Sequence, residues 1–295
     1  MKLRFKKRKL IAFIILILPL LITINISTLN VQSSPRGSQN PILFIHGWTG
    51  SASAWNIMRD RFYDDGWSSD LLIAISFSNP NDFSASGNIQ NAEYIKYCVN
   101  EILNNTSADK VDIIAHSMGG ISSRYYLKFL GGLNKVDDYV CFGSPHHGVI
   151  GGTQVFQPNC TFLNELNNGD ETPGGILNDT IGPRLDVVGG GIYNSTHTQG
   201  SINYTSIFSS ADTICLPYTT SILDGAHNIL VSGIGHVDML YNESFYTIIK
   251  NAVYDDHLAE SPENSIPGYK ILILWGFSSI SIILIIIIVK FKKIN

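Results

Sequence analysis

A serine at position 117 lies where the chain could present a nucleophile. Residues 111–115 form a largely apolar run typical of a buried strand, and apolar residues at helical spacing continue through 121–130. The segment matches the pattern G-x-S-x-G, with Ala115 in the first position and Gly119 in the last. Small residues suit this pattern because the turn strains the serine backbone and crowds its neighbours. The alternative is a serine that only caps the following helix.

A serine nucleophile needs a histidine to take its proton and a carboxylate to orient that histidine. Asp212 directly follows an expected strand at 204–209, and His236 follows the next one at 228–232. Since the carboxyl ends of parallel strands share one edge of a sheet, both side chains are expected near Ser117. Other side chains compete for these roles, namely His146, His147, His197, His227, Asp224 and Asp238.

Two backbone N–H groups are expected to stabilise the negative oxygen that attack on a carbonyl would create. One belongs to Met118, which follows the serine, and the other to Trp48 in the segment His46-Gly47-Trp48. Gly47 has no side chain, so this loop can approach a substrate oxygen closely. Each such donor lowers the barrier by about 3 kcal/mol.

A regular framework must hold these residues, and the periodicity of the chain predicts one. Strands and helices alternate, which indicates an α/β fold with a mostly parallel central sheet and helices on both faces. The expected strands are 41–45, 71–77, 111–115, 136–142, 204–209 and 228–232, and the expected helices are 51–66, 89–103, 121–130 and 237–254.

Residues 143–200 interrupt this alternation. Glycine, asparagine and threonine are frequent there, and a connection of this length without regular structure is uncommon unless it has a function. We interpret it as an insertion over the carboxyl edge of the sheet, where sites in α/β proteins open, and as a candidate lid. The catalytic domain, including this insertion, is expected to span 41–256.

Several motifs together resemble the small secreted bacterial triacylglycerol lipases of the α/β-hydrolase superfamily. They are Phe44-Ile45-His46-Gly47, the sequence KVDIIAHSMGG at 110–120, parts of 204–212, Leu223-Asp224-Gly225-Ala226, and Gly235-His236 with Leu240-Tyr241. The resemblance covers about 41–142 and 204–241 and includes the alanine at position 115. It implies an α/β-hydrolase fold, a triad of Ser117, Asp212 and His236 in the family's chain order, and an oxyanion hole formed by Trp48 and Met118.

Two features depart from that family. Its smallest members lack both the insertion at 143–200 and a C-terminal membrane segment. The motif at 143–148, GSPHHG, is instead similar to larger lipases of the superfamily, which carry lids and in some cases a metal. Asp238 occupies a position where some of those enzymes have a calcium ligand, so it is a weak candidate for structural calcium, which takes six to eight oxygen ligands. The expected reaction requires no cofactor.

Both ends of the chain have the composition of membrane segments. Residues 1–27 join a basic start to an apolar run, as in a signal peptide or an N-terminal signal anchor, and 28–40 form a polar linker. A juxtamembrane linker at 257–269, a transmembrane helix at 270–290 and a basic cytoplasmic tail at 291–295 are expected to follow the catalytic domain. The positive-inside rule then predicts an extracellular catalytic domain tethered to the cell membrane.

Composition limits the other classes of protein. A net charge of -4, with 15% charged residues, argues against a nucleic-acid partner. The four cysteines allow three disulfide pairings. Cys160 and Cys215 lie in loop-like contexts, which favours that pair, whereas Cys98 and Cys141 lie in apolar patterns that suit buried thiols.

These observations predict a serine-dependent ester hydrolase that acts on acylglycerol or similar acyl esters through an acyl-enzyme. The same residues would serve an acyltransferase, or a deacylase or amidase for lipid anchors or peptides. An alternative of another class is a cell-surface adhesion module that has the hydrolase fold without its activity.

Overall fold

A computed structural model describes residues 39–176 and 200–254. The chain divides into two compact units, Met1–Gln39 and Asn40–Asn295, and nearly all described residues belong to the second. The predicted signal segment, the transmembrane helix at 270–290 and the basic tail lie outside the described residues. Within the described ranges, no helix is both long and apolar enough to cross a membrane.

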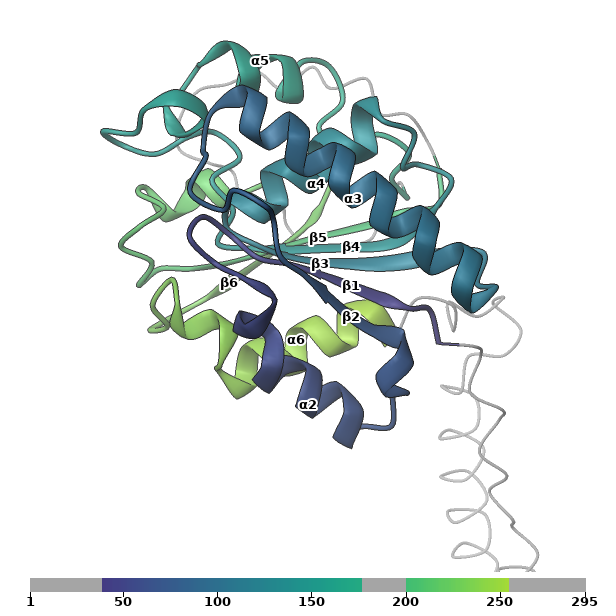
Figure 1. Cartoon of the computed structure of the whole chain (residues 1–295). Helices are drawn as coiled ribbons and strands as arrows, with labels where there is room; N and C mark the ends of the chain where they lie inside the picture. Colours follow the sequence, from purple (N-terminus) through teal and green to yellow (C-terminus); the bar gives the residue numbers. More distant parts are fainter. Residues whose placement is uncertain (1–38, 177–199, 255–295) are drawn as a thin grey trace, which may run out of the picture. The chain divides into compact units, whose positions relative to one another are not determined.

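Six parallel strands form the central sheet of the second unit (Figure 1). Their order across the sheet is β2-β1-β3-β4-β5-β6, and every neighbouring pair is parallel. The strands are β1 (Ile42–Ile45), β2 (Leu72–Ile75), β3 (Val111–His116), β4 (Val136–Phe142), β5 (Asn203–Ser209) and β6 (His227–Val231). The parallel sheet predicted from the sequence is confirmed.

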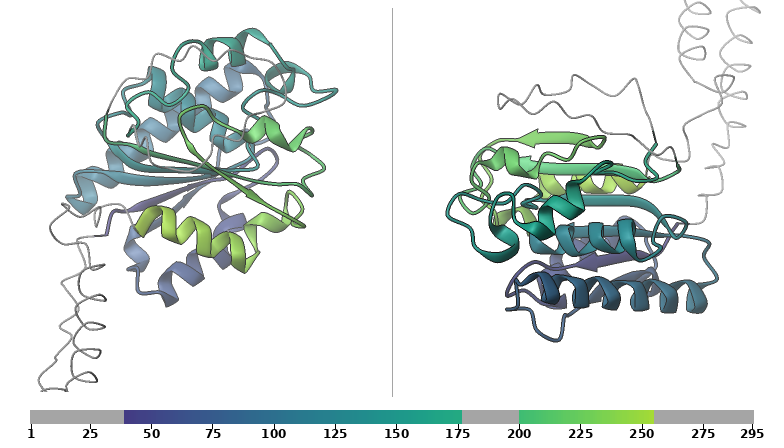
Figure 2. Two further views of the ribbon diagram at one scale, coloured as in Figure 1. Left: turned by 180° about the vertical axis from the view of Figure 1, so that it is seen from behind. Right: turned by 90° about the horizontal axis from the view of Figure 1, so that it is seen from above.

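Helices cover both faces of this sheet, as Figures 1 and 2 show. On one face lie α3 (Ala85–Thr106) and α4 (Met118–Phe129), and on the other lie α2 (Asn56–Asp64) and α6 (Glu243–Tyr254). The short helix α5 (Thr161–Asn167) packs against α4. The 3₁₀ helices are η1 (Ala52–Trp55), η2 (Ser69–Leu71), η3 (Gln154–Phe156), η4 (Tyr218–Ser221) and η5 (Asp238–Leu240).

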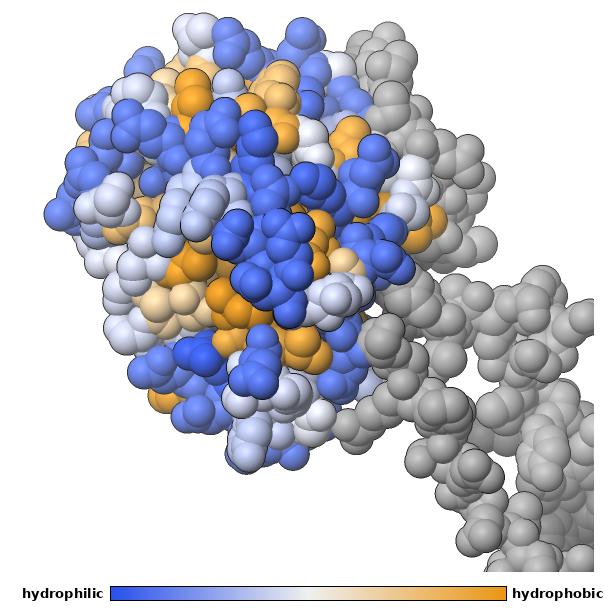
Figure 3. Space-filling view, turned by 45° about the vertical axis from the view of Figure 1, so that its right-hand side comes forward, coloured by the Kyte–Doolittle hydropathy of each residue, from blue (hydrophilic) through white to orange (hydrophobic). Residues whose placement is uncertain are grey.

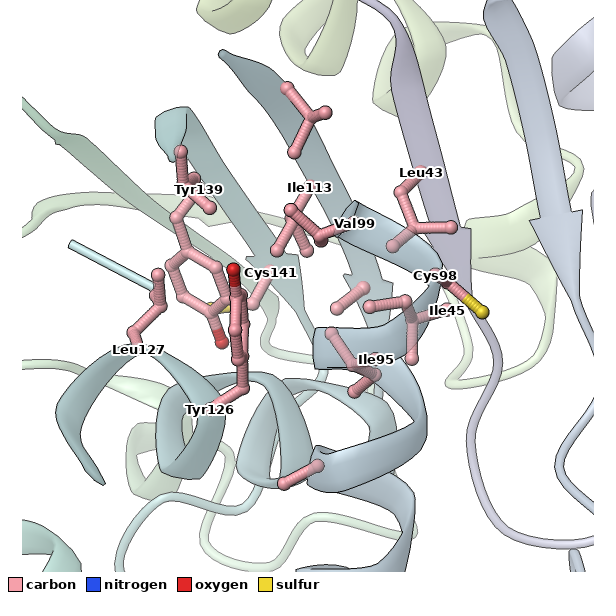
Figure 4. Packing of buried hydrophobic residues seen from close by; sticks show 14 of the residues in the cluster. Leu43, Ile45, Ile95, Cys98, Val99, Ile113, Tyr126, Leu127, Tyr139 and Cys141 are labelled. Carbon is pink, nitrogen blue, oxygen red and sulfur yellow. The ribbon is translucent and has the colours of Figure 1, made fainter. Parts of the chain in front are cut away.

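The apolar runs of β1 and β3 supply both hydrophobic cores because successive side chains of a strand point to opposite faces. Leu43 and Ile45 pack with α3 and α4, whereas Ile42 and Phe44 pack with α2 and α6. Figure 4 shows the first core, where side chains of α3 face those of β1, and Tyr126 of α4 and Tyr139 of β4 belong to the same core. Hydrophilic side chains cover most of the face drawn in Figure 3 and separate the hydrophobic ones into small groups.

All four helix predictions differ from the structure at their N-terminal ends. Helix α2 begins at Asn56, after η1, instead of at 51, and α4 begins at Met118 instead of 121. Helix α3 begins at Ala85 instead of 89, because the Ser84 hydroxyl accepts a hydrogen bond from the N–H of Gly87 at 3.0 Å. The helix predicted at 237–254 begins only at Glu243, after the short helix η5. Asn242 accepts a hydrogen bond from the N–H of Ser244 at 2.8 Å and so starts a new helix there.

The favoured disulfide was also wrong. All four cysteines are free thiols, and three of them, Cys98, Cys141 and Cys215, are buried. Cys215 donates to the carbonyl of Gly143 at 3.1 Å, and Cys160 caps α5 by accepting from the N–H of Leu163. The loop-like sequence around Cys160 and Cys215 therefore reflects a helix cap in the first case and a buried hydrogen bond in the second.

Candidate active site

Ser117 lies at the junction of β3 and α4 in a strained backbone conformation, with φ 54° and ψ −126°. Its neighbours must be small. A Cβ atom on Gly119 would lie 2.6 Å from the carbonyl oxygen of His46, and one on Gly47 would lie 2.7 Å from Cβ of Ser117. Two glycines therefore allow the loop after β1 to pass directly over the serine.

A relay of hydrogen bonds joins the three residues predicted as a triad. Nε2 of His236 lies 3.0 Å from Oγ of Ser117, and Nδ1 of His236 lies 2.7 Å from Oδ2 of Asp212. All three side chains are buried. Because a carboxylate only accepts, Nδ1 of His236 carries the proton, and Nε2 is free to accept from the serine hydroxyl.

The loop after β5 holds Asp212 in place. Its Oδ1 accepts hydrogen bonds from the N–H groups of Ile214 and Cys215 at 2.8 and 2.9 Å. Burial alone would raise the pKa of this carboxyl, but the hydrogen bonds from His236 and from the two N–H groups outweigh burial and hold the pKa below its usual value. Asp212 therefore stays ionised next to the imidazole.

The two predicted oxyanion donors flank the serine, since Met118 begins α4 and Trp48 follows Gly47. Among the described residues, neither N–H donates to another group of the chain. His46, whose role the sequence did not reveal, fixes the loop. Its Nε2 accepts from the N–H of Phe77 at 3.0 Å, so its Nδ1 carries the proton and donates to the carbonyl of Gly47 at 2.7 Å. Burial lowers the pKa of His46, which favours this neutral form.

His116 is a second residue that sequence reasoning missed. It is buried beside the serine, and its Nε2 lies 3.0 Å from the backbone carbonyl oxygen of His236. Its ring centroid lies 4.7 Å from that of the His236 ring. Burial, with the neighbouring His236, lowers the pKa of His116 to about 3, so its imidazole is neutral at ordinary pH.

The competing residues lie apart from this relay. His146 is buried with its Nε2 3.3 Å from Sγ of Cys141, and His147 pairs with Glu171 at 3.0 Å. His227 is exposed at the start of β6, and His197 lies outside the described residues.

The weak calcium candidate Asp238 is exposed on η5. Two groups of side chains in the described ranges bring ligand atoms close enough to share an ion, and neither includes Asp238. They are Asp212 with Cys215 and His236, and Asp112 with Asp137 and Asp138. The first group contains Asp212 and His236 of the relay described above. Calcium at Asp238 stays a prediction.

Comparisons with known proteins point to lipases. A family model described as Lipase (class 2) matches residues 39–177. A triacylglycerol lipase from Pseudarthrobacter phenanthrenivorans is 32% identical over 112 residues, which cover 37% of this chain and 34% of the relative. The chain spans about a third of the length of the curated relatives it matches.

Two solved structures share the fold. Lipase B of Aspergillus fumigatus superimposes with a TM-score of 0.56 at 16% identity, over 76% of this chain and 55% of that one. The mature form of the Bacillus licheniformis lipase BlEst2 gives a TM-score of 0.53 at 17% identity, over 75% of this chain and 94% of that one. Identities this low carry information on the fold alone, which is the α/β-hydrolase fold.

Proposed function

We propose that this protein is a serine-dependent carboxylic ester hydrolase that cleaves acylglycerol-type esters through an acyl-enzyme. The observation that carries the proposal is the unbroken relay from Asp212 through His236 to Ser117, beside two N–H groups that have no acceptor within the described chain. A capping serine would need neither a buried imidazole nor a buried carboxylate behind it.

In the first half of the reaction, Oγ of Ser117 attacks the ester carbonyl carbon while Nε2 of His236 takes the hydroxyl proton. The carbonyl oxygen becomes an oxyanion that accepts from the N–H groups of Trp48 and Met118. Asp212 stabilises the imidazolium and keeps its ring oriented. Collapse of the tetrahedral intermediate breaks the ester bond, and the leaving alkoxide takes the proton from His236.

In the second half, a water molecule replaces the alcohol. His236 takes a proton from the water, whose oxygen attacks the acyl-enzyme carbonyl. The same two N–H groups bind the second oxyanion. Its collapse breaks the bond to Oγ of Ser117, which takes the proton back from His236, and a carboxylic acid is released. His236 performs every proton transfer in this scheme and backbone N–H groups stabilise both oxyanions, so it calls for no cofactor.

Exposed apolar side chains near the relay favour an apolar ester as the substrate. Trp48 follows Gly47, Val237 follows His236, and the N–H of Ile214 donates to Asp212. The N–H of Ile150 donates to the carbonyl of Leu216 at 2.7 Å, which brings the insertion next to the same loop. All five side chains are at least 44% exposed. Apolar residues gathered around a polar relay suit the hydrocarbon part of a lipid.

We further propose that the catalytic domain faces outward and is tethered to the cell membrane by residues 270–290. The support is the uncharged apolar stretch 271–289, with lysines on both sides of it. The protein should sediment with membranes, and protease added to intact cells should remove the catalytic domain. A catalytic domain that survives until the cells are opened would contradict this orientation.

The catalytic proposal is tested by Ser117→Ala. Hydrolysis of a short-chain nitrophenyl ester should fall by about 10⁴-fold or more, and covalent labelling by a fluorophosphonate should vanish. Ser244→Ala is the matched control, because Ser244 is exposed on α6. Unchanged turnover in Ser117→Ala would refute the assignment. Analysis of the products with an added acceptor alcohol would separate hydrolysis from acyl transfer.

A further inference from the structure

His116 and Ser117 are consecutive in the chain, and both contact His236. Oγ of Ser117 meets the imidazole at Nε2, whereas the ring of His116 meets the backbone of the same histidine. A carbonyl oxygen can only accept, so Nε2 of His116 carries the proton and donates it at 3.0 Å. Within the described chain, this is the hydrogen bond that the carbonyl of His236 receives.

We propose that His116 is a positioning residue, which holds the backbone of His236 so that the base stays within reach of Ser117 during proton transfer. The role rests on the ester hydrolysis proposed above. It adds a third support for His236, besides the contacts that Asp212 and Ser117 make with the two ring nitrogens.

The loop that carries His236 needs such a support. It contains Gly233, at φ 79°, and Gly235, both of which give the backbone conformational freedom. Before His236, its side-chain anchor is the hydroxyl of Ser209, which accepts from the N–H of Ile234 at a long 3.2 Å. Helix η5 follows at Asp238. The bond from His116 therefore fixes the backbone at the catalytic residue itself.

Histidine suits this position better than a cationic donor. The ring centroids of His116 and His236 are 4.7 Å apart, and the reaction makes His236 an imidazolium. A lysine or arginine at position 116 would place a second positive charge against it in a buried site. The other charged and titratable groups around His116 are Asp212, which favours a cation there, and His46, which disfavours one. A neutral imidazole donates one hydrogen bond without opposing the proton transfer.

The test uses the full chain and three variants. Phe at position 116 keeps a ring but loses the donor, Leu loses both, and Gln keeps an N–H near the position of Nε2. For His116→Phe we expect kcat on a nitrophenyl ester to fall about 30- to 100-fold, because a small displacement of a catalytic group costs this much. KM should change less than about twofold, since the side chain of His116 is buried and contacts the backbone of His236. His116→Gln should recover kcat to within about fivefold of the parent protein.

A proton NMR spectrum gives a readout that a purely structural role would not change selectively. The Nδ1 proton of His236, held against Asp212, should resonate far downfield in the parent protein and in His116→Gln. It should broaden by exchange in His116→Phe and His116→Leu. Parent kcat in His116→Phe would overturn the proposal, as would equal losses in the Phe and Gln variants or the failure of both donor-free variants to fold. A parent protein without esterase activity or fluorophosphonate labelling would instead refute the proposed function.

Discussion

Two regions are joined through α4, the helix that begins after Ser117, and different kinds of contact hold them. The unit β3–α4 is specified by its own sequence, through apolar residues, glycines and the serine at the turn. The described part of the insertion, residues 143–176, contains only two short helices, η3 and α5. It is attached to α4 by side chains that reach across more than thirty residues of chain.

Arg124 and Lys128, one turn apart on α4, make most of these attachments. Arg124 is buried and donates to the carbonyls of Leu166 and Glu171 and to the side chain of Asn167. Lys128 donates to the carbonyls of Leu166, Asn168 and Asp170 at 2.8 to 2.9 Å. Backbone carbonyls without regular structure need such donors when they are buried. The C-terminal end of α5 and the segment that follows it are thus bound to α4.

One helix serves both regions. The N-terminus of α4 presents Ser117 and the N–H of Met118, and its later turns hold the insertion. The prediction of a lid over 143–200 remains a prediction. For its described part, a lid movement would have to break the contacts of Arg124 and Lys128, and the residues 177–199 lie outside the described chain.

The largest expected effect comes from Gly119→Ala at the turn. The added Cβ would lie 2.6 and 2.7 Å from the backbone carbonyl oxygens of His46 and Ile45, which cannot rotate away. We expect a loss of about 3 kcal/mol in the free energy of unfolding. We also expect a loss of at least 100-fold in kcat, because the loop that carries Trp48 must move. Chemical denaturation and esterase kinetics measure the two effects.

Gly169→Ala in the insertion is the matched control. Gly169 also has a conformation that favours glycine, with φ 75°, but a Cβ there would meet nothing within 4 Å. The cost should be about 1 kcal/mol from backbone strain, with kcat close to that of the parent protein. Equal losses in the two variants would break the distinction between a tightly specified turn and a tolerant insertion.

This distinction also explains which features could be predicted from the sequence. The strands, Ser117, Asp212 and His236 carry local signals, since each of these three residues lies within five residues after the end of a strand. The roles of His46, His116 and Arg124 carry no local signal, because their partners lie 22 to 120 residues away in most cases. Periodicity detects which face of an element is buried, but it does not detect which distant carbonyl a buried polar side chain will meet.

Arg124→Met is expected to lose about as much unfolding free energy as Gly119→Ala, but less activity. The substitution keeps an apolar side chain of similar length but leaves the carbonyls of Leu166 and Glu171 and the amide of Asn167 without this donor. Unsatisfied buried groups should cost about 2 to 3 kcal/mol in total. Limited proteolysis should become faster within 161–176, while kcat changes less than in Gly119→Ala.

Lys96→Met on α3 is the control for this loss of a positive charge. Lys96 pairs with the exposed Glu93 at 3.4 Å, a contact worth less than about 1 kcal/mol. If Arg124→Met leaves proteolysis of 161–176 unchanged, apolar packing around Phe162 and Leu163 holds the insertion instead.

The smallest effect expected of a single side chain is its part in a dependence of stability on pH that involves both regions. Burial lowers the pKa of three histidines, His46 and His116 near the turn and His146 at the start of the insertion; Arg124 adds to this effect at His146. Each binds a proton less tightly in the folded than in the unfolded chain, where its pKa is about 6.5. Unfolding therefore takes up protons below pH 6.5, and the free energy of unfolding falls as the pH falls. For His116 this window extends down to its folded pKa of about 3, with a slope of up to about 1.4 kcal/mol per pH unit.

Denaturation of the parent protein at pH 7.5 and at pH 5.5 measures this loss of unfolding free energy. Substitution of single histidines then shows which region the loss comes from. His116→Gln should reduce the loss by about 1 kcal/mol, since glutamine does not titrate. His227→Gln is the control, because His227 is exposed at the start of β6. A parent protein of equal stability at both pH values would mean that the three imidazoles remain solvated. If His146→Gln removes most of the loss, acid weakens the attachment of the insertion before it weakens the turn, because a protonated His146 would face the guanidinium of Arg124 at 3.4 Å.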